Sequence, residues 1–295
     1  MFVSFYGGLG NQMFQLAIGK ILSLSNNIPL IIDDSYYHFQ PKKDTPQKLE
    51  LDQFNINFDR YSTVNEKKYL HIMRIINKIK WLKKINNLSS SIIKTDIIIN
   101  DGDISTSYRI PNNSILIGYF QSEKYLLNHR EYILDLFTPR EDIYNIIKNT
   151  ECYNFINNNS NTTSVHIRRG DYISNPAANS HHGVCEISYY EKAINKIKLQ
   201  NPNTKFIFFS DDNEWIQNNF GHIKNSYFVD NKATSFSVVD IYLMSLCSNN
   251  IIANSSFSWW GAWLNRNESK IVLYPKKWTT RGGIGDLLVD GWIGL

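Results

Sequence analysis

The sequence predicts an α/β protein built on parallel sheets, and two observations support this prediction. Between residues 164 and 274, short apolar runs of strand length alternate with amphipathic helical patterns. Such alternation is typical of βαβ units, in which each helix crosses over to the next parallel strand. The chain also begins with a strand, a glycine-rich turn and a helix, in that order. Both halves of the chain are therefore expected to contain parallel sheets.

The first half of the chain contains fewer and more widely spaced elements. Apolar runs bounded by polar residues predict strands at 2–5, 28–32 and 114–117. Helical periodicity predicts helices at 11–25, 66–86, 122–136 and 141–157. The polar stretch around Pro41 and Pro46 shows no hydrophobic periodicity, so no helix or strand is predicted there.

The run 157–163, NNNSNTT, also lacks periodicity and marks the predicted domain boundary. We expect domains at 1–157 and 158–295, each long enough to bury its own core. In the second domain, strands are predicted at 164–168, 205–210, 226–229, 250–253 and 270–274. Helices are predicted between them at 188–199, 212–219, 236–247 and 257–265.

Composition excludes several classes of protein. Of the 295 residues, 42% are hydrophobic and 14% aromatic, which excludes a disordered chain, and no apolar run has the length of a membrane span. The net charge of +4 gives little reason to expect a nucleic-acid partner. Met1 is followed directly by strand residues without a signal-peptide pattern, so a cytoplasmic location is expected. The 3 cysteines are widely spaced and suggest neither a disulfide framework nor a zinc site.

A basic segment at 67–84 has helical periodicity. Its apolar residues form one stripe, comprising Ile72, Ile75, Ile76, Ile79 and Leu82. One interpretation is a surface helix whose stripe packs on its own domain. The other is a basic amphipathic contact with the anionic inner face of the cytoplasmic membrane.

The stretch His166-Ile167-Arg168-Arg169-Gly170-Asp171 is the most informative of the sequence. Arg168 and Arg169 leave the end of a predicted strand, and paired guanidiniums in such a place suit the oxygens of a diphosphate. A purely structural alternative is that the two arginines pair with nearby carboxylates such as Asp171.

Two further stretches have the character of phosphate sites. Gly7-Gly8-Leu9-Gly10-Asn11-Gln12 joins the first strand to the first helix, where backbone N–H groups can meet an anion. Asn254-Ser255-Ser256 follows the strand at 250–253 and precedes a helix, which these polar side chains could cap. In a parallel sheet, Arg168, Asp211 and Ser255 would all follow the carboxyl ends of strands, the edge at which α/β sheets bind ligands.

These motifs together resemble those of the bacterial α-1,2-fucosyltransferases of glycosyltransferase family 11. The resemblance spans residues 7 to about 264 and also includes Gly118-Tyr119-Phe120-Gln121-Ser122-Glu123 and His182-Gly183-Val184. It implies a GT-B-like α/β fold, with two Rossmann-like domains facing across a cleft. The domain at 158–295 would bind GDP-fucose, and the domain at 1–157 would lie on the acceptor side. The activity implied is inverting transfer of L-fucose from GDP-β-L-fucose to the 2-hydroxyl of a terminal β-galactoside, without an obligatory metal.

The chemistry of that transfer assigns roles to the candidates. Negative charge accumulates on the departing GDP, so preorganised donors around the β-phosphate are the first requirement. Arg168 is expected to supply them. Arg169 would either bind the same phosphates or pair with Asp171. Further donor contacts are expected from Gly8, Gly10, Asn11, Ser255 and Ser256.

A general base and a metal are less directly indicated. His166, Asp171 and His182 are candidates for the base, although the place of His166 on the strand also suits a nucleotide contact. Asp211 and Asp212 invite a metal hypothesis, but helix capping by either carboxylate explains the pair, and Asp211 is expected to contact guanine or ribose rather than a metal. The tryptophans at 259, 260 and 263 have helical spacing, which favours a place in the core.

In a bacterial-type cytoplasmic chain, the acceptor is expected to be a galactose-terminated, lipid-linked oligosaccharide of a surface polysaccharide such as O-antigen. Two alternatives compete with the transferase. An NAD(P)-dependent oxidoreductase would use Gly8-Leu9-Gly10 with Asp33 or Asp34, but Met13 stands where the third glycine should be. A noncatalytic carbohydrate-binding protein is suggested by the abundance of tyrosine and tryptophan.

Overall fold

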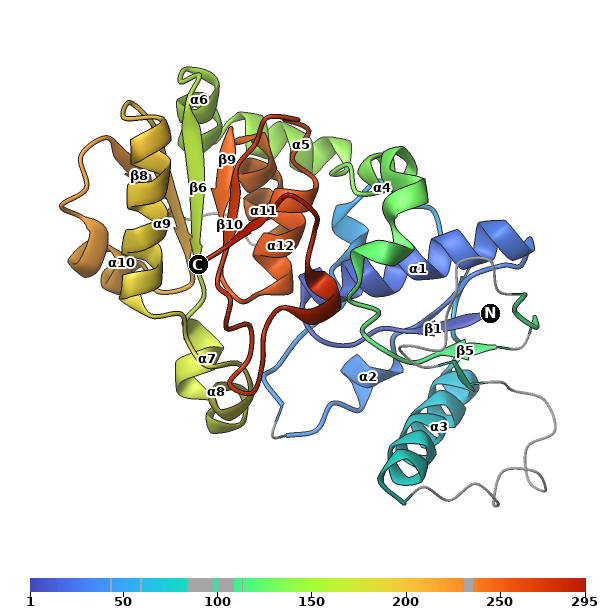
Figure 1. Cartoon of the computed structure of the whole chain (residues 1–295). Coiled ribbons are helices and arrows are strands. Elements are labelled where there is room, and N and C mark those ends of the chain that lie inside the picture. Colours follow the sequence, from blue (N-terminus) through green and yellow to red (C-terminus); the bar gives the residue numbers. More distant parts are fainter. Residues whose placement is uncertain (43, 59, 84–97, 100–108, 113, 231–235) are drawn as a thin grey trace. The chain divides into compact units, whose positions relative to one another are not determined.

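The computed structural model describes residues 1–42, 44–58, 60–83, 98–99, 109–112, 114–230 and 236–295. Within helices and strands, side chains are not described at 60, 76–83, 98–99, 171, 177–178 and 181. The chain forms two compact units, an N-terminal unit (1–52 and 56–137) and a C-terminal unit (53–55 and 138–295). Each unit has its own parallel sheet with helices, as the ribbon in Figure 1 shows. The predicted α/β fold class is confirmed.

The N-terminal unit contains a sheet of order β3-β2-β1-β5-β4, in which all described pairings are parallel. Its strands are β1 (Phe2–Ser4), β2 (Ile31–Asp33), β3 (Arg60–Tyr61), β4 (Ile98–Ile99) and β5 (Ile115–Leu116). Its α-helices are α1 (Leu9–Asn26), α2 (Ser35–His38), α3 (Val64–Lys83) and α4 (Arg130–Leu136). Short 3₁₀ turns are η1 (Leu51–Gln53), η2 (Glu123–Tyr125) and η3 (Leu127–His129). Of the helix predicted at 122–136, only the last part, α4, is an α-helix, and two 3₁₀ turns precede it.

Helix α1 begins at Leu9, two residues before the predicted start at 11. Gly8 is the extended N-cap residue, and Gly7 has a φ of 79°. A Cβ atom on Gly7 would lie 2.5 Å from Nδ2 of Asn11, so both the backbone and the close approach require glycine. Gly10 and Asn11 therefore lie in the first turn of α1 rather than in a loop.

Helix α3 packs against the sheet with a face that the sequence did not predict. Leu70 and Met73 are buried and pack with Ile115 of β5. Ile72 and Ile75, the first two residues of the predicted packing stripe, are 54% and 46% exposed. The rest of that stripe, at 76, 79 and 82, lies outside the described side chains. The predicted packing of the helix on its own unit is therefore confirmed, but in the described turns Leu70 and Met73 make the contact and the stripe residues Ile72 and Ile75 do not.

The C-terminal unit contains a sheet of order β11-β10-β9-β6-β7-β8, again parallel throughout its pairings. Its strands are β6 (Thr162–Ile167), β7 (Lys205–Ser210), β8 (Ser226–Phe228), β9 (Asn249–Ile251), β10 (Val272–Tyr274) and β11 (Ile293–Gly294). Its α-helices are α5 (Glu141–Lys148), α6 (Glu151–Asn157), α7 (Gly170–Ser174), α8 (Pro176–His182), α9 (Ile187–Gln200), α10 (Asn213–Phe220), α11 (Ser237–Leu246) and α12 (Ser256–Trp263). A 3₁₀ turn, η5 (Gly285–Leu287), precedes β11.

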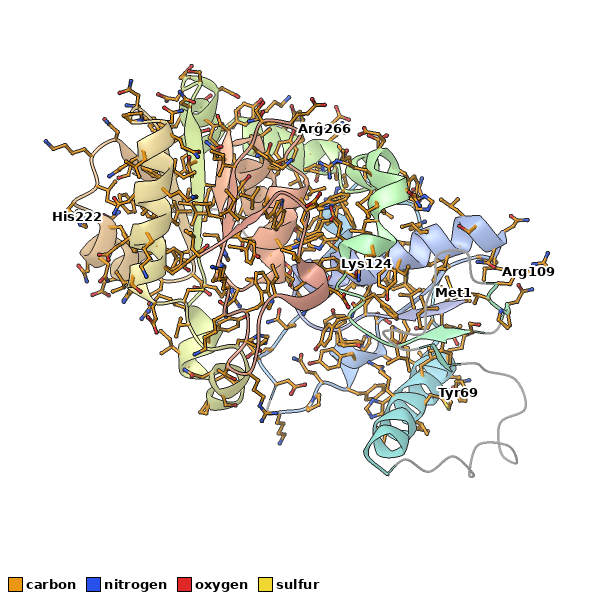
Figure 2. The ribbon with its side chains drawn as sticks, in the orientation of Figure 1. Met1, Tyr69, Arg109, Lys124, His222 and Arg266 are labelled. Atoms are coloured by element: carbon orange, nitrogen blue, oxygen red, sulfur yellow. The ribbon has the colours of Figure 1, made fainter. Side chains whose placement is uncertain are left out.

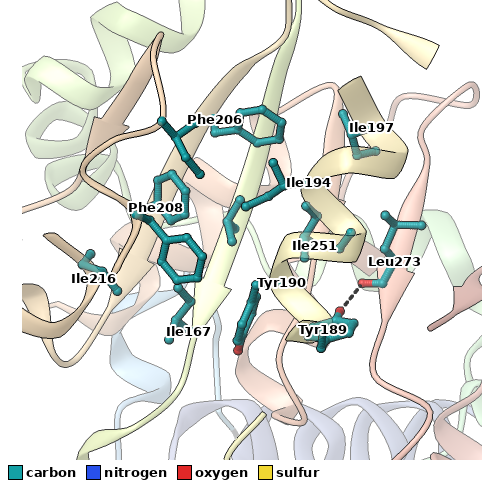
Figure 3. Packing of buried hydrophobic residues seen from close by; sticks show 14 residues of the cluster. Ile167, Tyr189, Tyr190, Ile194, Ile197, Phe206, Phe208, Ile216, Ile251 and Leu273 are labelled. Carbon is teal, nitrogen blue, oxygen red and sulfur yellow. Dashed lines mark hydrogen bonds between the residues drawn. The ribbon is translucent and has the colours of Figure 1, made fainter. Parts of the chain in front are cut away.

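Strand β6 is the fully buried centre of this sheet. Its side chains alternate between the two faces. On one face, Val165 and Ile167 pack with Phe206, Phe208 and the buried side of α9, as Figure 3 shows. Tyr189 of α9 fixes that helix, because its hydroxyl donates to the carbonyl oxygen of Leu273 at 3.0 Å. The core therefore holds the end of β6 rigidly, and with it the arginines that follow.

The two units divide at 137 and 138, rather than at the predicted boundary of 157 and 158. Helices α5 and α6 belong with the C-terminal unit because they pack against α11. They also replace the single helix predicted at 141–157. The helical structure is interrupted between the two helices. The hydroxyl of Thr150 caps α6 by accepting from the N–H of Tyr153 at 3.1 Å.

No helix in the described part of the chain is long and apolar enough to cross a membrane. The chain terminus is itself part of the N-terminal unit, since the ammonium of Met1 donates to the carbonyl oxygen of Pro29 at 2.9 Å. Figure 2 draws the described side chains as sticks and labels Met1 among them.

Candidate functional site

Arg168 and Arg169 follow directly after β6 and meet the two aspartates that follow β7. Nη1 of Arg168 lies 2.8 Å from Oδ2 of Asp211. Nε of Arg169 lies 3.1 Å from Oδ2 of Asp212, and the backbone N–H of Arg169 donates to Oδ1 of Asp211 at 2.9 Å. Because β6 and β7 are adjacent and parallel, their carboxyl ends bring these four side chains to one edge of the sheet.

Aromatic rings support both guanidiniums. Cζ of Arg169 lies 3.9 Å from the ring centroid of Trp215 on α10, and Cζ of Arg168 lies 5.6 Å from that of Tyr172 on α7. Stacking limits the rotamers of a long side chain, so each guanidinium keeps its direction. Arg168 remains 30% exposed and Asp211 28% exposed, which leaves this edge open to a ligand.

Gly170 is required by the closeness of Asp211. A Cβ atom on residue 170 would lie 2.7 Å from Oδ2 of Asp211, the oxygen that pairs with Arg168. The glycine of the Arg-Arg-Gly-Asp stretch thus permits the ion pair beside it. The side chain of Asp171 lies outside the described part of the chain, so its predicted pairing and its candidacy as a base stay predictions.

Asp212 has a structural role that the sequence predicted. Its Oδ1 accepts from the N–H of Trp215 at 3.1 Å, so Asp212 caps α10 while its other oxygen pairs with Arg169. Among the described residues, no group of three or more His, Cys, Asp and Glu side chains could hold a metal ion. Both aspartates are positioned by cations of the chain itself.

A second polar edge follows β9, the other neighbour of β6. Ser255 caps α12, since its hydroxyl accepts from the N–H of Phe257 at 3.3 Å. Ser256 is the first residue of α12 and is half-buried. Figure 1 shows α12 beside the sheet of the C-terminal unit. The predicted capping is confirmed, and the helix presents a positive dipole end after β9.

Asn254 points inward instead of toward a ligand. It is 2% exposed, and its Nδ2 lies within hydrogen-bond distance of the carbonyl oxygens of His182, Gly183 and Trp278, at 3.0, 3.2 and 3.2 Å. Asn254 therefore ties the end of α8 to the start of α12. Sequence reasoning grouped it with Ser255 as an anion ligand, and the signal that could have separated them is that a buried amide mostly bonds to backbone.

His166 is buried on the side of β6 that faces α12. It is 5% exposed, and its ring centroid lies 5.5 Å from that of Phe257. Among the described residues, Nδ1 of His166 has no hydrogen-bond partner. Burial, with a smaller contribution from the cation of Arg168, lowers the pKa of His166 from 6.5 to about 4, although Asp211 opposes the shift. The imidazole is therefore neutral and weakly basic at pH 7.

His182 lies at the end of α8 and stacks on Tyr172, with a centroid distance of 4.7 Å and an interplanar angle of 1°. Tyr172 in turn donates its hydroxyl to the carbonyl oxygen of Asn254 at 3.3 Å. A chain of contacts thus joins Arg168, Tyr172, His182 and Asn254. The sequence indicated His182 but not Tyr172, because nothing in the order of residues shows which aromatic ring lies under an arginine.

The candidates Gly8, Gly10 and Asn11 belong to the N-terminal unit. Asn11 accepts a hydrogen bond from Nε2 of Gln121 at 2.6 Å. In the same unit, Asp33 is fully buried and accepts from the hydroxyl of Ser4 at 2.5 Å. Asp34, the other carboxylate of the oxidoreductase alternative, pairs with Nζ of Lys67 at 2.9 Å. Aspartates held in this way are not presented to a ribose, which removes the main support for that alternative.

The tryptophans of α12 belong to the core, as predicted. Trp259 and Trp260 are fully buried and Trp263 is 2% exposed. The indole N–H of Trp259 donates to the carbonyl oxygen of Leu287 at 2.7 Å, so the polar atom is also used within the fold.

Two parallel-sheet α/β units and an arginine pair at the carboxyl edge of the second sheet define a GT-B-like glycosyltransferase fold. A solved structure with this fold, a mutant of FUT1 from Arabidopsis thaliana in complex with GDP, matches 92% of this chain and 69% of its own with a TM-score of 0.57, at 10% identity. The model of the family described as glycosyl transferase family 11 matches residues 2–294. The chain belongs to glycosyltransferase family 11.

Two curated relatives come from Escherichia coli. The O-antigen biosynthesis glycosyltransferase WbnK is 41% identical over 302 residues, covering 100% of both chains. An alpha-1,2-colitosyltransferase is 36% identical over 285 residues, covering 93% of this chain and 91% of its own. The chain is thus similar to glycosyltransferases over essentially its whole length, and a noncatalytic carbohydrate-binding protein is no longer a competing interpretation.

Proposed function

We propose that the protein is an inverting α-1,2-fucosyltransferase, which moves L-fucose from GDP-β-L-fucose to the 2-hydroxyl of a terminal β-galactoside. One observation supports this most directly. Arg168 and Arg169 leave the central strand of the C-terminal sheet beside the capped start of α12, in a chain of glycosyltransferase family 11. Such an edge suits the diphosphate of a nucleotide sugar.

In the proposed reaction, the acceptor 2-hydroxyl attacks C1 of fucose as the bond from C1 to the β-phosphate oxygen breaks. The electron pair of that bond leaves with GDP, and the configuration at C1 inverts from β to α. Arg168 binds the β-phosphate oxygens and stabilises the developing charge. A guanidinium carries five N–H donors, so a pair with Asp211 is compatible with a second anionic partner. Arg169, Ser255 and Ser256 add donors to the same diphosphate, and Asp211 contacts guanine or ribose.

The acceptor proton needs a destination. His166 is buried and has a lowered pKa, so it is a poor base at neutral pH. We infer that its neutral imidazole supports the nucleotide side of the site. The proton would then pass to Asp171 or His182, or to the departing phosphate in a dissociative step.

We further propose that the transfer needs no metal. Asp211 and Asp212 form ion pairs with Arg168 and Arg169. We infer that these carboxylates position the two arginines and do not coordinate a metal ion. A transferase that needs manganese would lose activity in chelator and regain it on adding the ion.

The acceptor we propose is a galactose-terminated, lipid-linked oligosaccharide for a surface polysaccharide, handled at the inner face of the cytoplasmic membrane. The similarity to an O-antigen glycosyltransferase supports this. On α3, Val64, Lys68, Ile72 and Ile75 share one exposed face that could contact the lipid surface. Cosedimentation with anionic vesicles should fall for the double variant Ile72→Asp with Ile75→Asp, and equal sedimentation of variant and wild type would refute the contact.

The decisive experiment is an assay with chelator, in which purified protein is mixed with GDP-fucose and galactose-terminated disaccharides. We expect GDP release and a product heavier by one deoxyhexose. Arg168→Lys should lower kcat by about 100-fold, since a point charge cannot reproduce the fork. Wild-type protein that neither binds GDP nor transfers fucose under any condition would overturn the proposal.

Colitose is the second candidate for the transferred sugar, because an alpha-1,2-colitosyltransferase is similar over most of the chain. Colitose is fucose without the 3-hydroxyl, and an arginine pair that binds the diphosphate does not distinguish the two. Competition between GDP-fucose and GDP-colitose in one assay decides, since the ratio of kcat/KM identifies the donor.

A further inference from the structure

The carboxyl edge of the N-terminal sheet carries a cluster of tyrosines to which the proposed reaction has assigned no role. Strands β2, β1 and β5 are neighbours in that sheet and run in parallel. Each is followed within three residues by a tyrosine, namely Tyr36, Tyr6 and Tyr119. Parallel strands end at the same edge, so the topology gathers these rings where α/β sheets bind ligands.

The rings are in mutual contact. The centroid of Tyr6 lies 4.8 Å from that of Tyr119 and 6.0 Å from that of Tyr36. Tyr119 is 43% exposed and the other two are half-buried, so the cluster has an open aromatic surface. We call these three residues the tyrosine cluster.

Buried amides fix the backbone on which the tyrosine cluster stands. Gln15 of α1 is fully buried, and its Oε1 accepts from the N–H of Tyr6 at 3.2 Å. Its Nε2 donates to the carbonyl oxygen of Gly118 at 3.2 Å, next to Tyr119. One side chain therefore sets the positions of two of the three tyrosines.

The segment that carries Tyr119 also stores backbone strain. Phe120 has a φ of 51°, a conformation that a bulky residue rarely adopts, and its side chain is 2% exposed. Such residues concentrate where a site has to be held in one geometry. Gln121, two residues after Tyr119 in the chain, donates to Asn11, so the same segment also carries an amide pair.

The chemistry of this surface fits a neutral pyranose. Aromatic faces attract the weakly positive C–H face of a sugar, while phenol and amide groups exchange hydrogen bonds with its hydroxyls. Burial and the hydrogen bond to Asp44 raise the pKa of Tyr36, so its phenol stays uncharged. Guanidinium pairs of the kind that follow β6 suit a diphosphate instead.

We propose that the tyrosine cluster, with the Asn11 and Gln121 amides, is the subsite for the terminal hexose of the acceptor. This assigns Asn11 to the acceptor, whereas the sequence predicted a contact with the donor. This inference rests on the proposed function and adds to it the residues that recognise the acceptor sugar. It makes Tyr119, whose ring is the most exposed of the three, the main stacking surface.

The test compares Tyr119→Ala, Tyr119→Phe and the control Tyr61→Ala, in which a tyrosine of the same unit with 44% exposure is removed. For Tyr119→Ala we expect the KM for a β-galactoside such as lactose to rise about tenfold. The KM for the nucleotide sugar and the slow hydrolysis of that donor without acceptor should be unchanged. Tyr119→Phe keeps the ring and should stay within about threefold of wild type. Tyr61→Ala should match wild type, and thermal melts check that all variants fold.

Binding of the acceptor alone separates this inference from the proposed function. Saturation-transfer NMR with lactose should show sugar protons close to the protein in wild type, and weaker transfer in Tyr119→Ala. If the wild type transfers fucose but Tyr119→Ala keeps its acceptor KM, or raises the donor KM instead, the subsite assignment is wrong. If no galactoside is fucosylated, the proposed function fails. In that case, a panel of other hexosides in the same NMR experiment tests the tyrosine cluster by itself. Signals that are present in wild type and lost in Tyr119→Ala support a hexose subsite. The absence of signal from every hexoside refutes it.

Discussion

At the scale of single residues, the arginine pair depends on neighbours that make room for it. Asp211 receives both the guanidinium of Arg168 and the backbone N–H of Arg169, and Gly170 leaves the space in which this happens. Glycine is therefore required at position 170 as much as the charged residues are at theirs, because a Cβ atom there would lie 2.7 Å from Oδ2 of Asp211.

Gly170→Ala is therefore expected to displace Asp211 and, through it, Arg168. Transfer activity should fall about tenfold to a hundredfold, since small displacements of a positioned group are costly. Stability should hardly change, because alanine favours the helix that begins at 170. Gly282→Ala is the matched control, as its Cβ would meet nothing within 4 Å. Equal kcat/KM for Gly170→Ala and Gly282→Ala would show that the contact does not position Arg168.

The buried His166 is expected to make the stability of the protein depend on pH. Its pKa is about 4 in the folded protein and 6.5 in its ordinary state. Below pH 6.5 the unfolded chain binds a proton that the folded protein does not, so the free energy of unfolding falls as the pH drops from 6.5 to 4. Between pH 7 and pH 5 this one group should cost about 2 kcal/mol.

Urea unfolding at pH 7 and pH 5 measures that difference for wild type and for His166→Gln. Other titrating groups contribute to both proteins, so the comparison isolates residue 166. We expect a smaller loss of stability in the variant. An identical loss in both proteins would mean that His166 titrates normally in the folded state.

At the scale of elements, helix α3 is attached to the sheet by charge as well as by apolar packing. Arg74 lies on the buried face of α3, with Nη2 3.7 Å from Oδ2 of the fully buried Asp33, and it also contacts the hydroxyl of Ser35. Two turns earlier on α3, Nζ of Lys67 lies 2.9 Å from Oδ1 of Asp34. The end of β2 thus holds the helix at two points.

Arg74→Met should lower the free energy of unfolding by about 3 kcal/mol, because it leaves a buried carboxylate without its cation. This loss is at the low end of the roughly 3–5 kcal/mol that breaking a buried ion pair costs. The reason is that Asp33 keeps its hydrogen bonds from the hydroxyl of Ser4 and from the N–H of Ser35. Urea unfolding of Arg74→Met beside Lys68→Met, an exposed cation of the same helix, provides the measurement. A loss no larger than that of Lys68→Met would show that the pair with Asp33 is not stabilising.

At the scale of the whole molecule, the division of the chain at 137 and 138 has a testable consequence. Helices α5 and α6 bury Ile143, Ile147, Cys152 and Ile156 within the C-terminal unit. A fragment that begins at 158 would expose the face of α11 against which they pack.

We expect a fragment of residues 138–295 to unfold cooperatively on heating, as followed by circular dichroism. A fragment of residues 158–295 should show no cooperative transition or a much lower Tm, because its core is incomplete. Equal Tm values for the two fragments would restore the boundary at 157 and 158.

Part of the site was predictable because its residues follow one another in the sequence. Arg168 and Arg169 are adjacent, the Ser255 cap directly precedes its helix, and the strand before each motif is a continuous apolar run. Local order is sufficient for such features, since capping and strand formation are decided within a few residues.

The remaining features depend on contacts between residues far apart in the chain. The pairing of Arg168 with Asp211, the inward direction of Asn254 and the gathering of three tyrosines follow from strand order. The buried face of α3 was mispredicted for the same reason, since only the sheet decides which side it covers.

The sequence by itself determined the α/β class, most of the strands and helices, and the family resemblance, because periodicity and contiguous motifs are local properties. Only the tertiary structure decided where the units divide, which carboxylates hold the arginines and which tyrosines meet. The physical reason is that parallel strands distant in the chain end at a common edge, and their neighbours in the sheet are set by packing of the whole unit.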